Sequence, residues 1–323
     1  MNATVPAIQT DRLGRDYGGT RALDNLDLQV APGTLVGLLG PNGAGKTTAM
    51  LLLATLLAPS RGSGRIFGYD ITRDRREVRR RLGLAFQESS VDGMLTVREN
   101  LLFAARLSGV AGRQAGELVD EALERNGLAT RSHTPARQLS GGWRRLVDIT
   151  RATLLHPDLL ILDEPTVGLD PEHRQLVWSL LDGERRVRGT TVLFSTHYLA
   201  EAESADLVVL LAAGQVVASN APAALRMDVG SEVAEVEGPA AERLVTALRG
   251  LGAVESSLRT ERGFRVGLRG SREAAVELAG SAPGIERFSL RPTNLEDVYF
   301  ARIQAVRQPQ PRAEVARVHA VPA

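Results

Sequence analysis

The most constraining feature of the sequence is a glycine-rich loop, GPNGAGKT at residues 40–47, between an apolar run and a leucine-rich segment. The apolar run at residues 34–39 predicts a buried strand, and the leucine spacing from residue 47 to about residue 57 predicts a helix. The loop matches the pattern G-x-x-x-x-G-K-[ST] at every specified position, in the strand–loop–helix context that this pattern requires. A glycine-rich turn that contains a lysine by chance would not need to lie between a strand and a helix. The sequence therefore predicts a phosphate-binding loop.

Each part of this loop has a physical role in holding phosphate. Glycines let backbone N–H groups close around phosphate oxygens, and the helix N-terminus adds a favourable dipole. Lys46 can neutralise the terminal phosphate, and the Thr47 hydroxyl can ligate Mg²⁺. Lys46 is the only lysine in a sequence rich in arginine, which indicates a position where a planar guanidinium cannot replace a compact ammonium. The predicted phosphate-binding residues are Gly40, Pro41, Asn42, Gly43, Ala44, Gly45, Lys46, Thr47 and Thr48.

Composition limits the kind of protein. The chain has 323 residues, enough for one large and one small domain, and its 43% apolar and 24% charged residues are ordinary for globular proteins. The formal net charge of +1 gives no overall attraction to nucleic acid, so no nucleic-acid partner is expected. The absence of cysteine excludes disulfides, thiolate metal sites and thiol catalysis.

No segment predicts secretion or a membrane span. The N-terminus lacks the basic-then-apolar layout of a secretory signal. The apolar stretches at residues 50–58 and 207–213 are far shorter than the roughly 18 residues of a spanning helix. We expect the protein to stay inside the cell, so that another chain must supply the channel if transport is its task.

Alternating strands and helices predict an α/β domain over residues 1–222. Residues 159–162 and 191–194 are continuous apolar runs between helical segments, which is typical of strands buried on both faces of a parallel sheet. We predict further strands at residues 65–67 and 84–87. Helices are expected at about residues 74–81 and in an insertion, a helical subdomain, at about residues 92–150.

The pattern changes at about residue 231. From there the order strand–helix–strand–strand–helix–strand predicts a small C-terminal α+β domain over residues 231–304, with the βαββαβ order of the ferredoxin-like fold. A last helix is predicted from about residue 295. The final residues, 305–323, are expected to be disordered.

Two adjacent carboxylates, Asp163 and Glu164, follow the predicted strand at residues 159–162. Strand carboxyl ends open onto the ligand crevice of an α/β sheet, so this pair is placed to meet a nucleotide held by the glycine loop. By itself, an acid pair after a strand more often belongs to a turn. The functional interpretation of this pair depends on the predicted phosphate-binding loop upstream. We predict that Asp163 holds Mg²⁺ and that Glu164 polarises the attacking water.

The segment LSGGWRR at residues 139–145 resembles the signature loop of the ABC ATPases, a family of P-loop NTPases. The resemblance implies that Ser140, Gly141 and Gly142 contact an ATP held by a second copy, so that ATP drives formation of a homodimer. The implied cofactors are ATP and Mg²⁺. Trp143 stands where the family most often has glutamine. We expect it to anchor the following helix, the alternative being a ligand or partner role.

Other positions match the motifs of this family in the family's order, over roughly residues 10–218. Gln87 matches the Q-loop glutamine, which implies a catalytic and metal-binding role and a link to the membrane subunit. Asp170 matches the D-loop at the dimer seam, and His197 matches the switch histidine, a catalytic residue that contacts the γ-phosphate. Tyr17 matches the aromatic residue that stacks on adenine, and the alternative is a turn residue before Gly-Gly.

The segment RPTNLEDVYF at residues 291–300 is similar to the ending of ATP-binding subunits of ABC-2-type drug exporters, with Asn294 as an extra residue. A helix capped by Thr293 explains the same letters, and both interpretations can hold. The similarity implies an ATP-hydrolysing subunit, at the cytoplasmic face of the membrane, that powers a separate integral membrane permease. Export is then favoured over import, and the second domain is expected to stabilise the dimer or regulate it.

Two other classes share part of the pattern. A soluble ABC ATPase acting on nucleic acid or the ribosome has the same signature, but such proteins usually carry coiled-coil or zinc insertions or two cassettes in one chain. A small-molecule kinase or GTPase could use the same glycine loop. It would not account for the signature segment, Asp170 and His197 together.

Overall fold

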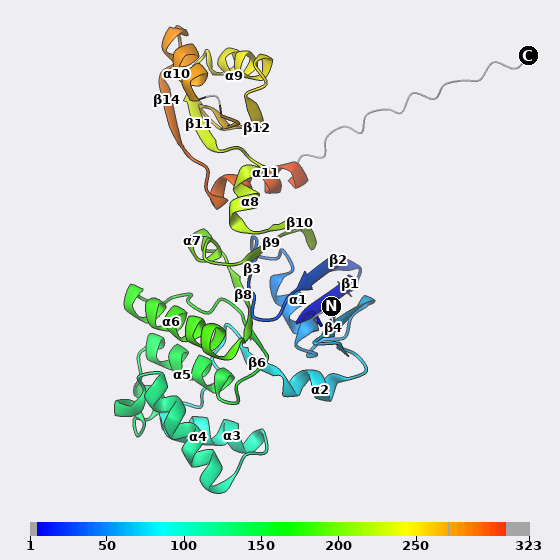
Figure 1. The fold of residues 1–323 in the computed structure, drawn as a ribbon, viewed down its shortest axis with the longest axis vertical. Helices are drawn as coiled ribbons and strands as arrows, with labels where there is room; N and C mark the ends of the chain where they lie inside the picture. Colours follow the sequence, from blue (N-terminus) through cyan, green and yellow to red (C-terminus); the bar gives the residue numbers. More distant parts are fainter. Residues whose placement is uncertain (1–4, 271, 308–323) are drawn as a thin grey trace, which may run out of the picture. The chain divides into compact units, whose positions relative to one another are not determined.

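A computed structural model describes residues 5–270 and 272–307 of the chain (Figure 1). The chain divides after Pro222 into two compact units. Each unit has its own sheet and its own cluster of buried apolar side chains.

The first unit is built around a six-stranded sheet. Five strands are parallel, and the edge strand β10 is antiparallel to its neighbour. In spatial order the strands are β10 (Gln215–Asn220), β9 (Leu207–Ala212), β3 (Leu35–Leu39), β8 (Thr191–Thr196), β7 (Leu159–Leu162) and β6 (Leu82–Ala85). β3, β7 and β8 are buried along their whole length, as expected of strands covered on both faces.

The register of the parallel strands brings several segments to one edge of the sheet. Leu39 is opposite Thr196, and Leu162 is opposite both Phe194 and Ala85. Because parallel strands end on the same side, the chain leaves β3, β6, β7 and β8 at neighbouring points. This edge is therefore the place where residues distant in sequence meet.

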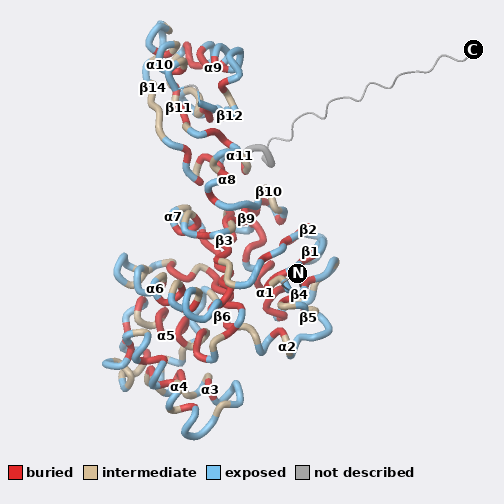
Figure 2. Tube along the Cα trace, viewed as in Figure 1, coloured by how far each residue is buried: buried red, intermediate tan, exposed pale blue. Residues whose placement is uncertain are grey.

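A second sheet lies on the same hydrophobic core. It has the order β2-β1-β4-β5 and is antiparallel throughout. Its strands are β1 (Ile8–Tyr17), β2 (Thr20–Val30), β4 (Arg61–Ile66) and β5 (Tyr69–Asp70). Side chains from both sheets and from α1 (Lys46–Leu53) form one buried cluster, and the buried stretches in Figure 2 follow these elements. α1 is thus held against the sheets by its apolar residues.

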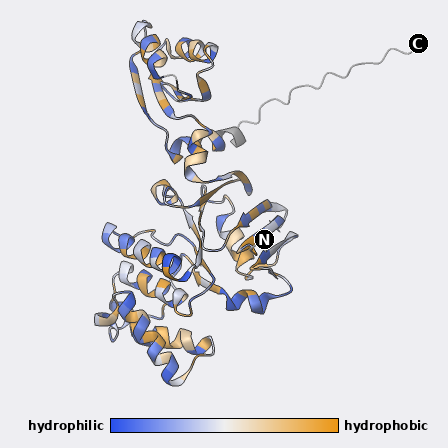
Figure 3. Cartoon of the chain, viewed as in Figure 1, coloured by the Kyte–Doolittle hydropathy of each residue, from blue (hydrophilic) through white to orange (hydrophobic). Residues whose placement is uncertain are grey.

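Helices make up the rest of the first unit. Thr96 starts α3 with a capping box, accepting from the N–H of Glu99 while Glu99 accepts from the N–H of Thr96. α2 is hydrophilic except for its buried Val78 (Figure 3). The helices are α2 (Arg75–Arg80), α3 (Val97–Leu107), α4 (Gly112–Arg125), α5 (Gly141–Thr153), α6 (Pro171–Arg188) and α7 (Leu199–Ala202), with 3₁₀ turns at Ala129–Arg131 and Ala136–Gln138. α8 (Pro222–Met227) belongs to the second unit except for its first residue.

The second unit contains a four-stranded antiparallel sheet in the order β12-β13-β11-β14. Apolar residues of α9 and α10 pack on alternate residues of the strands, such as Ala234 and Val236. The elements in chain order are β11 (Glu232–Glu237), α9 (Ala241–Gly250), β12 (Val254–Arg259), β13 (Gly263–Leu268), α10 (Arg272–Ser281), β14 (Arg287–Pro292) and α11 (Leu295–Arg307).

Several boundaries differ from the sequence-based expectations. α1 ends at Leu53 rather than near residue 57, because Thr55 has a φ of 60°, outside the helical region. α11 continues to Arg307, so residue 305 does not begin the predicted tail. Residues 308–323 lie outside the described part of the chain. The strand predicted at residues 65–67 is the end of the longer β4.

Candidate functional site

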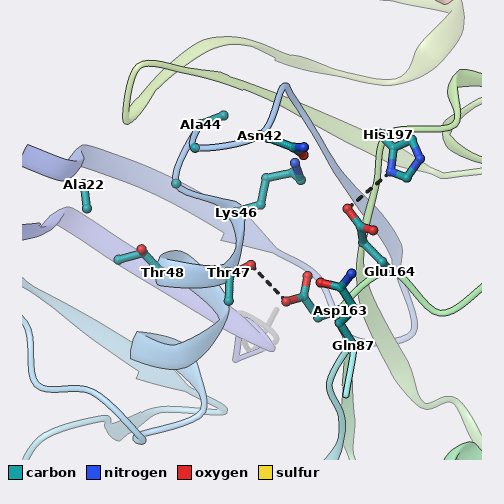
Figure 4. Close-up of a pocket in the computed structure, with 12 residues that line it drawn as sticks. Ala22, Asn42, Ala44, Lys46, Thr47, Thr48, Gln87, Asp163, Glu164 and His197 are labelled. Atoms are coloured by element: carbon teal, nitrogen blue, oxygen red, sulfur yellow. Dashed lines mark hydrogen bonds and ion pairs between the residues drawn. The ribbon is translucent and has the colours of Figure 1, made fainter. Parts of the chain in front are cut away.

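A cavity of about 670 Å³ opens at the carboxyl ends of the parallel strands. Its wall combines the glycine loop after β3 with residues that follow β6, β7 and β8. The sequence predicts all of the lining residues except Ala22: they are Ala22, Asn42, Gly43, Ala44, Gly45, Lys46, Thr47, Thr48, Gln87, Asp163, Glu164 and His197 (Figure 4). The volume is in the range of cavities that hold small-molecule ligands and cofactors.

The loop requires glycine at two positions for packing reasons. Gly45 has a φ of 104°, and a Cβ there would lie 2.6 Å from the carbonyl oxygen of Ala22. A Cβ on Gly40 would lie 2.3 Å from the carbonyl oxygen of Leu211. Both distances are far below contact distance, so side chains at these positions would push the loop away from β2 and β9.

Lys46 is the cation of the cavity, and only 6% of the residue is exposed. Its Nζ donates to the carbonyl oxygens of Gly40 at 2.7 Å and Pro41 at 3.2 Å. Burial lowers the pKa of Lys46, while the carboxylates of Glu164 and Asp163 oppose that shift. Gly40 and Pro41, the two acceptors of these bonds, are not among the residues that line the cavity. The loop thus carries a pre-positioned positive charge.

A hydroxyl and a carboxylate meet beside the loop. Thr47 Oγ1 donates to Asp163 Oδ2 at 2.9 Å (Figure 4), and Ser195 donates through its hydroxyl to the other oxygen of Asp163. Gln87, two residues after the end of β6, also lines the cavity. These groups present oxygen atoms, the ligands that Mg²⁺ prefers. Among the described residues no cluster of three or more His, Cys, Asp or Glu side chains could hold a metal alone.

Glu164 and His197 are in contact in the wall of the cavity. His197 Nδ1 lies 3.2 Å from Glu164 Oε1, and Figure 4 shows the two side chains next to each other on one side of Lys46. Glu164 has an unusual φ of 46° for a residue with a side chain. The site therefore combines a carboxylate and an imidazole that can hold a water molecule near a phosphate bound by the loop.

Tyr17 lies outside the cavity lining. It ends β1 at the Gly18-Gly19 turn, with 45% of the residue exposed, and the guanidinium of Arg15 lies 4.9 Å from its ring centroid. Ala22, from the strand that follows the turn, lines the cavity instead. An adenine ring would therefore reach Tyr17 only by extending past the lining residues.

The signature segment and Asp170 also lie outside this cavity. Ser140 caps α5 by accepting from the N–H of Trp143 at 3.4 Å, and Asp170 caps α6 by accepting from the N–H of His173 at 2.9 Å. The rings of Trp143 and His173 meet edge to face, with centroids 5.1 Å apart. The Arg131 guanidinium lies 3.7 Å from the Trp143 ring centroid. Trp143 thus anchors the start of α5 by aromatic contacts.

The structure also shows two site residues that the sequence did not single out. Ser195 is the hydroxyl that joins Asp163 to Glu164, since it also accepts from the N–H of Glu164 at 2.9 Å. A polar residue within a buried strand, two positions before His197, was the available signal. His173 connects the signature segment to Asp170, and its position three residues after a helix cap was the only hint.

Comparisons with known proteins identify the family to which the chain belongs. The sequence profile of the family described as "ABC transporter" matches residues 23–167. The daunorubicin/doxorubicin resistance ATP-binding protein of Streptomyces peucetius is 39% identical over 303 residues, which cover 91% of this chain and 92% of that protein. The chain belongs to the ABC transporter ATP-binding proteins. It is therefore an ABC ATPase, which hydrolyses ATP to power transport.

Further relatives cover the same ABC ATPase region. The Nod factor export ATP-binding protein I of Paraburkholderia xenovorans is 40% identical over 235 residues, 72% of this chain and 77% of that protein. A solved ATP-binding subunit of an ABC transporter has a TM-score of 0.62 and 30% identity, covering 68% of this chain and 92% of its own. A dimeric ATP-binding cassette with bound ADP and Pi has a TM-score of 0.61 and 26% identity, covering 66% and 98%.

Over the described residues, every helix is too short or too polar to span a bilayer.

Proposed function

We propose that this ABC ATPase drives an ABC-2-type exporter of drugs or other hydrophobic compounds. The similarity to a drug-resistance protein extends over 91% of the chain, so it includes the second unit as well as the ATPase unit. A Nod factor exporter subunit is related over 72% of the chain. We assign the protein to the cytoplasmic face of the membrane, where ATP is available and where a separate permease presents its inner side.

ATP is held mainly by the glycine loop in this proposal. Backbone N–H groups of the loop and the Lys46 ammonium bind the phosphates. Thr47, Asp163 and Gln87 hold Mg²⁺, and the fit is supported by their oxygen atoms and by the hydrogen bond between Thr47 and Asp163. Because a lone carboxylate is a weak metal site, these residues would hold Mg²⁺ together with bound nucleotide rather than alone. Mg²⁺ supplies charge neutralisation for phosphoryl transfer.

Hydrolysis is assigned to Glu164, with His197 and Gln87 as its partners. Glu164 accepts the proton of the attacking water, His197 contacts the terminal phosphate, and Gln87 orients the water and the metal shell. The contact between His197 Nδ1 and Glu164 Oε1, at 3.2 Å, supports this division of roles. Both side chains face the loop from the ends of neighbouring strands.

The position of Ser140 and Asp170 outside the cavity supports the proposal of a homodimer. The cavity contains the glycine loop, Glu164 and His197, whereas Ser140 and Asp170 lie outside it. Two copies related by a two-fold axis would each offer Ser140, Gly141, Gly142 and Asp170 to the other's ATP. A related cassette forms a dimer in its solved structure. ATP would then join the copies, and hydrolysis would release them.

We assign the permease to a groove between α2, α3 and α5. Exposed apolar side chains of Phe103, Leu107 and Leu155 lie in it beside a row of arginines on α2. These arginines are Arg75, Arg76, Arg79 and Arg80. The composition fits a permease segment that carries both apolar and acidic side chains. The groove also includes residues of β6, the strand that leads to Gln87, so permease contact would reach the site by a short path.

The second unit is proposed to be a ferredoxin-like accessory domain over residues 231–304, following an ATPase domain over residues 1–222. Its strand order β12-β13-β11-β14 and its βαββαβ chain order support this topology. We propose that it stabilises or regulates the ATPase dimer. Unchanged dimerisation and ATPase rate in a chain ending near Asn220 would contradict that role.

The proposal is tested in inside-out vesicles that contain a permease which copurifies with this chain. Purified chain, Mg²⁺ and ATP should drive accumulation of a fluorescent anthracycline, since a related protein confers resistance to such drugs. The Glu164→Gln chain is the matched control and should bind to the vesicles without driving accumulation. Accumulation that is equal with both chains, or ATP hydrolysis absent from the wild-type chain, would refute the proposal.

A further inference from the structure

The backbone of Glu164 is held in the left-handed region from both sides. Its φ is 46°, a conformation that residues with a side chain adopt only when their surroundings impose it. Its N–H donates to the Ser195 hydroxyl at 2.9 Å, and its carbonyl oxygen accepts from Nη2 of Arg145 at 3.3 Å. The orientation of the Glu164 carboxylate therefore depends on a residue of α5.

Arg145 makes main-chain contacts with three successive residues around Glu164. Its Nη2 donates to the carbonyl oxygen of Asp163 at 2.9 Å, and its Nε donates to that of Pro165, also at 2.9 Å. Its Nη1 donates to the carbonyl oxygen of Phe86, the residue before Gln87. One planar guanidinium thus joins the turn after β7 to the segment after β6, a geometry that its forked donors allow.

The guanidinium is buried, so its charge needs a counter-charge. Arg145 is 8% exposed, and burial lowers the pKa of its side chain against the effect of nearby Asp148 and Asp163. Asp148, one turn further along α5 and fully buried, lies 3.5 Å from Nη1 of Arg145. The unfavourable burial of this charge is offset by hydrogen bonds to four carbonyl oxygens, so the donors of the guanidinium hold those four carbonyl groups in place.

The same cluster reaches the segment after Gln87. Asp148 accepts from the Ser90 hydroxyl at 3.1 Å and pairs with Arg151 at 3.1 Å. Arg151 also donates to the Ser90 carbonyl oxygen at 2.8 Å and lines the groove assigned above to the permease. Gln87 therefore lies between two anchors on α5, one at Phe86 and one at Ser90.

We propose that Arg145 is a positioning residue that makes α5 set the geometry of Glu164 and Gln87 together. α5 begins at the signature segment. A shift of that helix would therefore move both Glu164, the assigned base, and Gln87, which is assigned to orient the attacking water. The inference rests on the proposed roles of Glu164 and Gln87. It adds a residue that touches neither ATP nor water but determines where those two side chains lie.

The test compares Arg145→Met with Arg145→Lys in the full-length chain. Both variants lose the fork that joins the two segments, and Lys retains the charge. We expect kcat for ATP hydrolysis to fall about 100-fold, the scale of a small misplacement of catalytic groups, with the KM for ATP within about threefold of wild type. Arg185→Met is the matched control, because Arg185 also joins a helix to a carbonyl oxygen and an aspartate, at Gly33 and Asp206. It should leave kcat unchanged.

The double variant Arg145→Met/Asp148→Asn separates positioning from stability. Removing both charges should raise Tm toward the wild-type value relative to Arg145→Met, because in that single variant the fully buried Asp148 keeps only Arg151 as a counter-charge. kcat should stay low. Recovery of kcat together with Tm would overturn the proposal, and so would a wild-type kcat in either single variant. If Arg145→Met fails to fold, the Lys and double variants decide the matter by the same criteria.

Glu164→Gln distinguishes a failure of this inference from a failure of the proposed function. If Glu164→Gln abolishes hydrolysis while the Arg145 variants do not, only the positioning role is wrong. If Glu164→Gln hydrolyses ATP at the wild-type rate, the assigned base is wrong and the inference falls with it.

Discussion

The imidazole ring of His173 lies where a side chain on Gly142 would have to be. A Cβ on Gly142 would be 2.3 Å from Cγ and 2.5 Å from Cδ2 of that ring. The ring is held in place by Asp170, whose Oδ2 lies 2.7 Å from His173 Nδ1. The second glycine of the signature segment is therefore required within one copy of the chain, by contact with His173, whose ring is held by Asp170, the cap of the next helix.

This contact predicts that Gly142→Ala is harmful and that a smaller residue at position 173 relieves it. The added methyl group should cost about 1–3 kcal/mol of unfolding free energy, because the ring has to move. In Gly142→Ala/His173→Ala the space is available, so Tm should be higher than in Gly142→Ala. Thermal unfolding of the two single variants and the double variant measures this. Strictly additive losses of stability would show that the ring and the glycine are not coupled.

Lys46 provides a second prediction. We expect Lys46→Met to raise the Kd for ATP at least about tenfold, since a charged hydrogen bond to phosphate is lost. Lys46→Arg should lose affinity too, because a planar guanidinium does not fit the loop carbonyls of Gly40 and Pro41. Equilibrium binding of a fluorescent ATP analogue gives both values. Wild-type affinity in Lys46→Met would remove the basis of the proposed nucleotide site.

Glu164→Gln should separate ATP binding from hydrolysis. The amide cannot accept the proton of the attacking water, so kcat should fall by about 10²–10⁴. ATP should still bind, and chains should accumulate as dimers that persist because ATP is not consumed. Phosphate release and size-exclusion chromatography with Mg²⁺ and ATP measure the two effects. Glu172→Gln, at an exposed position in the first turn of α6, is the control and should behave as wild type.

Thr47 should determine how ATPase activity depends on Mg²⁺. Thr47→Val keeps the shape of the side chain but removes the hydroxyl that donates to Asp163 at 2.9 Å. We expect a higher Mg²⁺ concentration for half-maximal activity and lower kcat, whereas Thr47→Ser should stay near wild type. Titration of Mg²⁺ at constant ATP tests this. Identical titration curves for the Val and Ser variants would exclude Thr47 as a metal ligand.

A further prediction concerns the stability of the second unit, which contains the buried carboxylate of Asp297. Asp297 in α11 is bonded by both terminal nitrogens of Arg291 at 2.7 Å, and Arg265 lies 3.5 Å away. Asp297→Ala should destabilise this unit by about 3–5 kcal/mol, because the arginines lose their buried partner. Glu296→Ala should cost less than about 1 kcal/mol, since Glu296 is exposed and 3.9 Å from Arg265. Urea unfolding compares the variants, and equal midpoints would contradict this role.

The contact between Asp297 and Arg291 gives a structural reason for the aspartate in the segment Leu295-Glu296-Asp297. The similarity to exporter subunits and the interpretation as a capped helix both rest on residues 291–300. Within them, Asp297 connects α11 to β14 through its two hydrogen bonds with Arg291. Thr293 donates to the carbonyl oxygen of Gly230 rather than serving as the helix cap. Asn294 takes the capping place, because its Oδ1 accepts from the N–H of Asp297 at 3.2 Å.

The strands of the N-terminal sheet illustrate where sequence patterns were insufficient. β1 was not predicted, because bulges interrupt its alternation between Thr10 and Leu13 and again before Arg15. β2 was not predicted either, although Leu26, Leu28 and Val30 alternate with exposed residues. Alternation of apolar and polar residues is the main sequence signal for a half-buried strand, and each bulge shifts this alternation by one residue. β3 and β7 were predictable, since both are continuous apolar runs buried on both faces.

The sequence by itself determined the glycine loop, the acid pair at Asp163 and the order of the motifs. These features depend on local requirements, such as glycine in a left-handed backbone or a lysine beside phosphate, that are visible in consecutive residues. Only the tertiary structure decided that Arg145 grips the carbonyl groups beside Glu164, that His173 fills the space at Gly142, and that Tyr17 lies outside the cavity. Such contacts join segments far apart in the chain, and their geometry is set by how helices and strands pack rather than by any pattern along one of them.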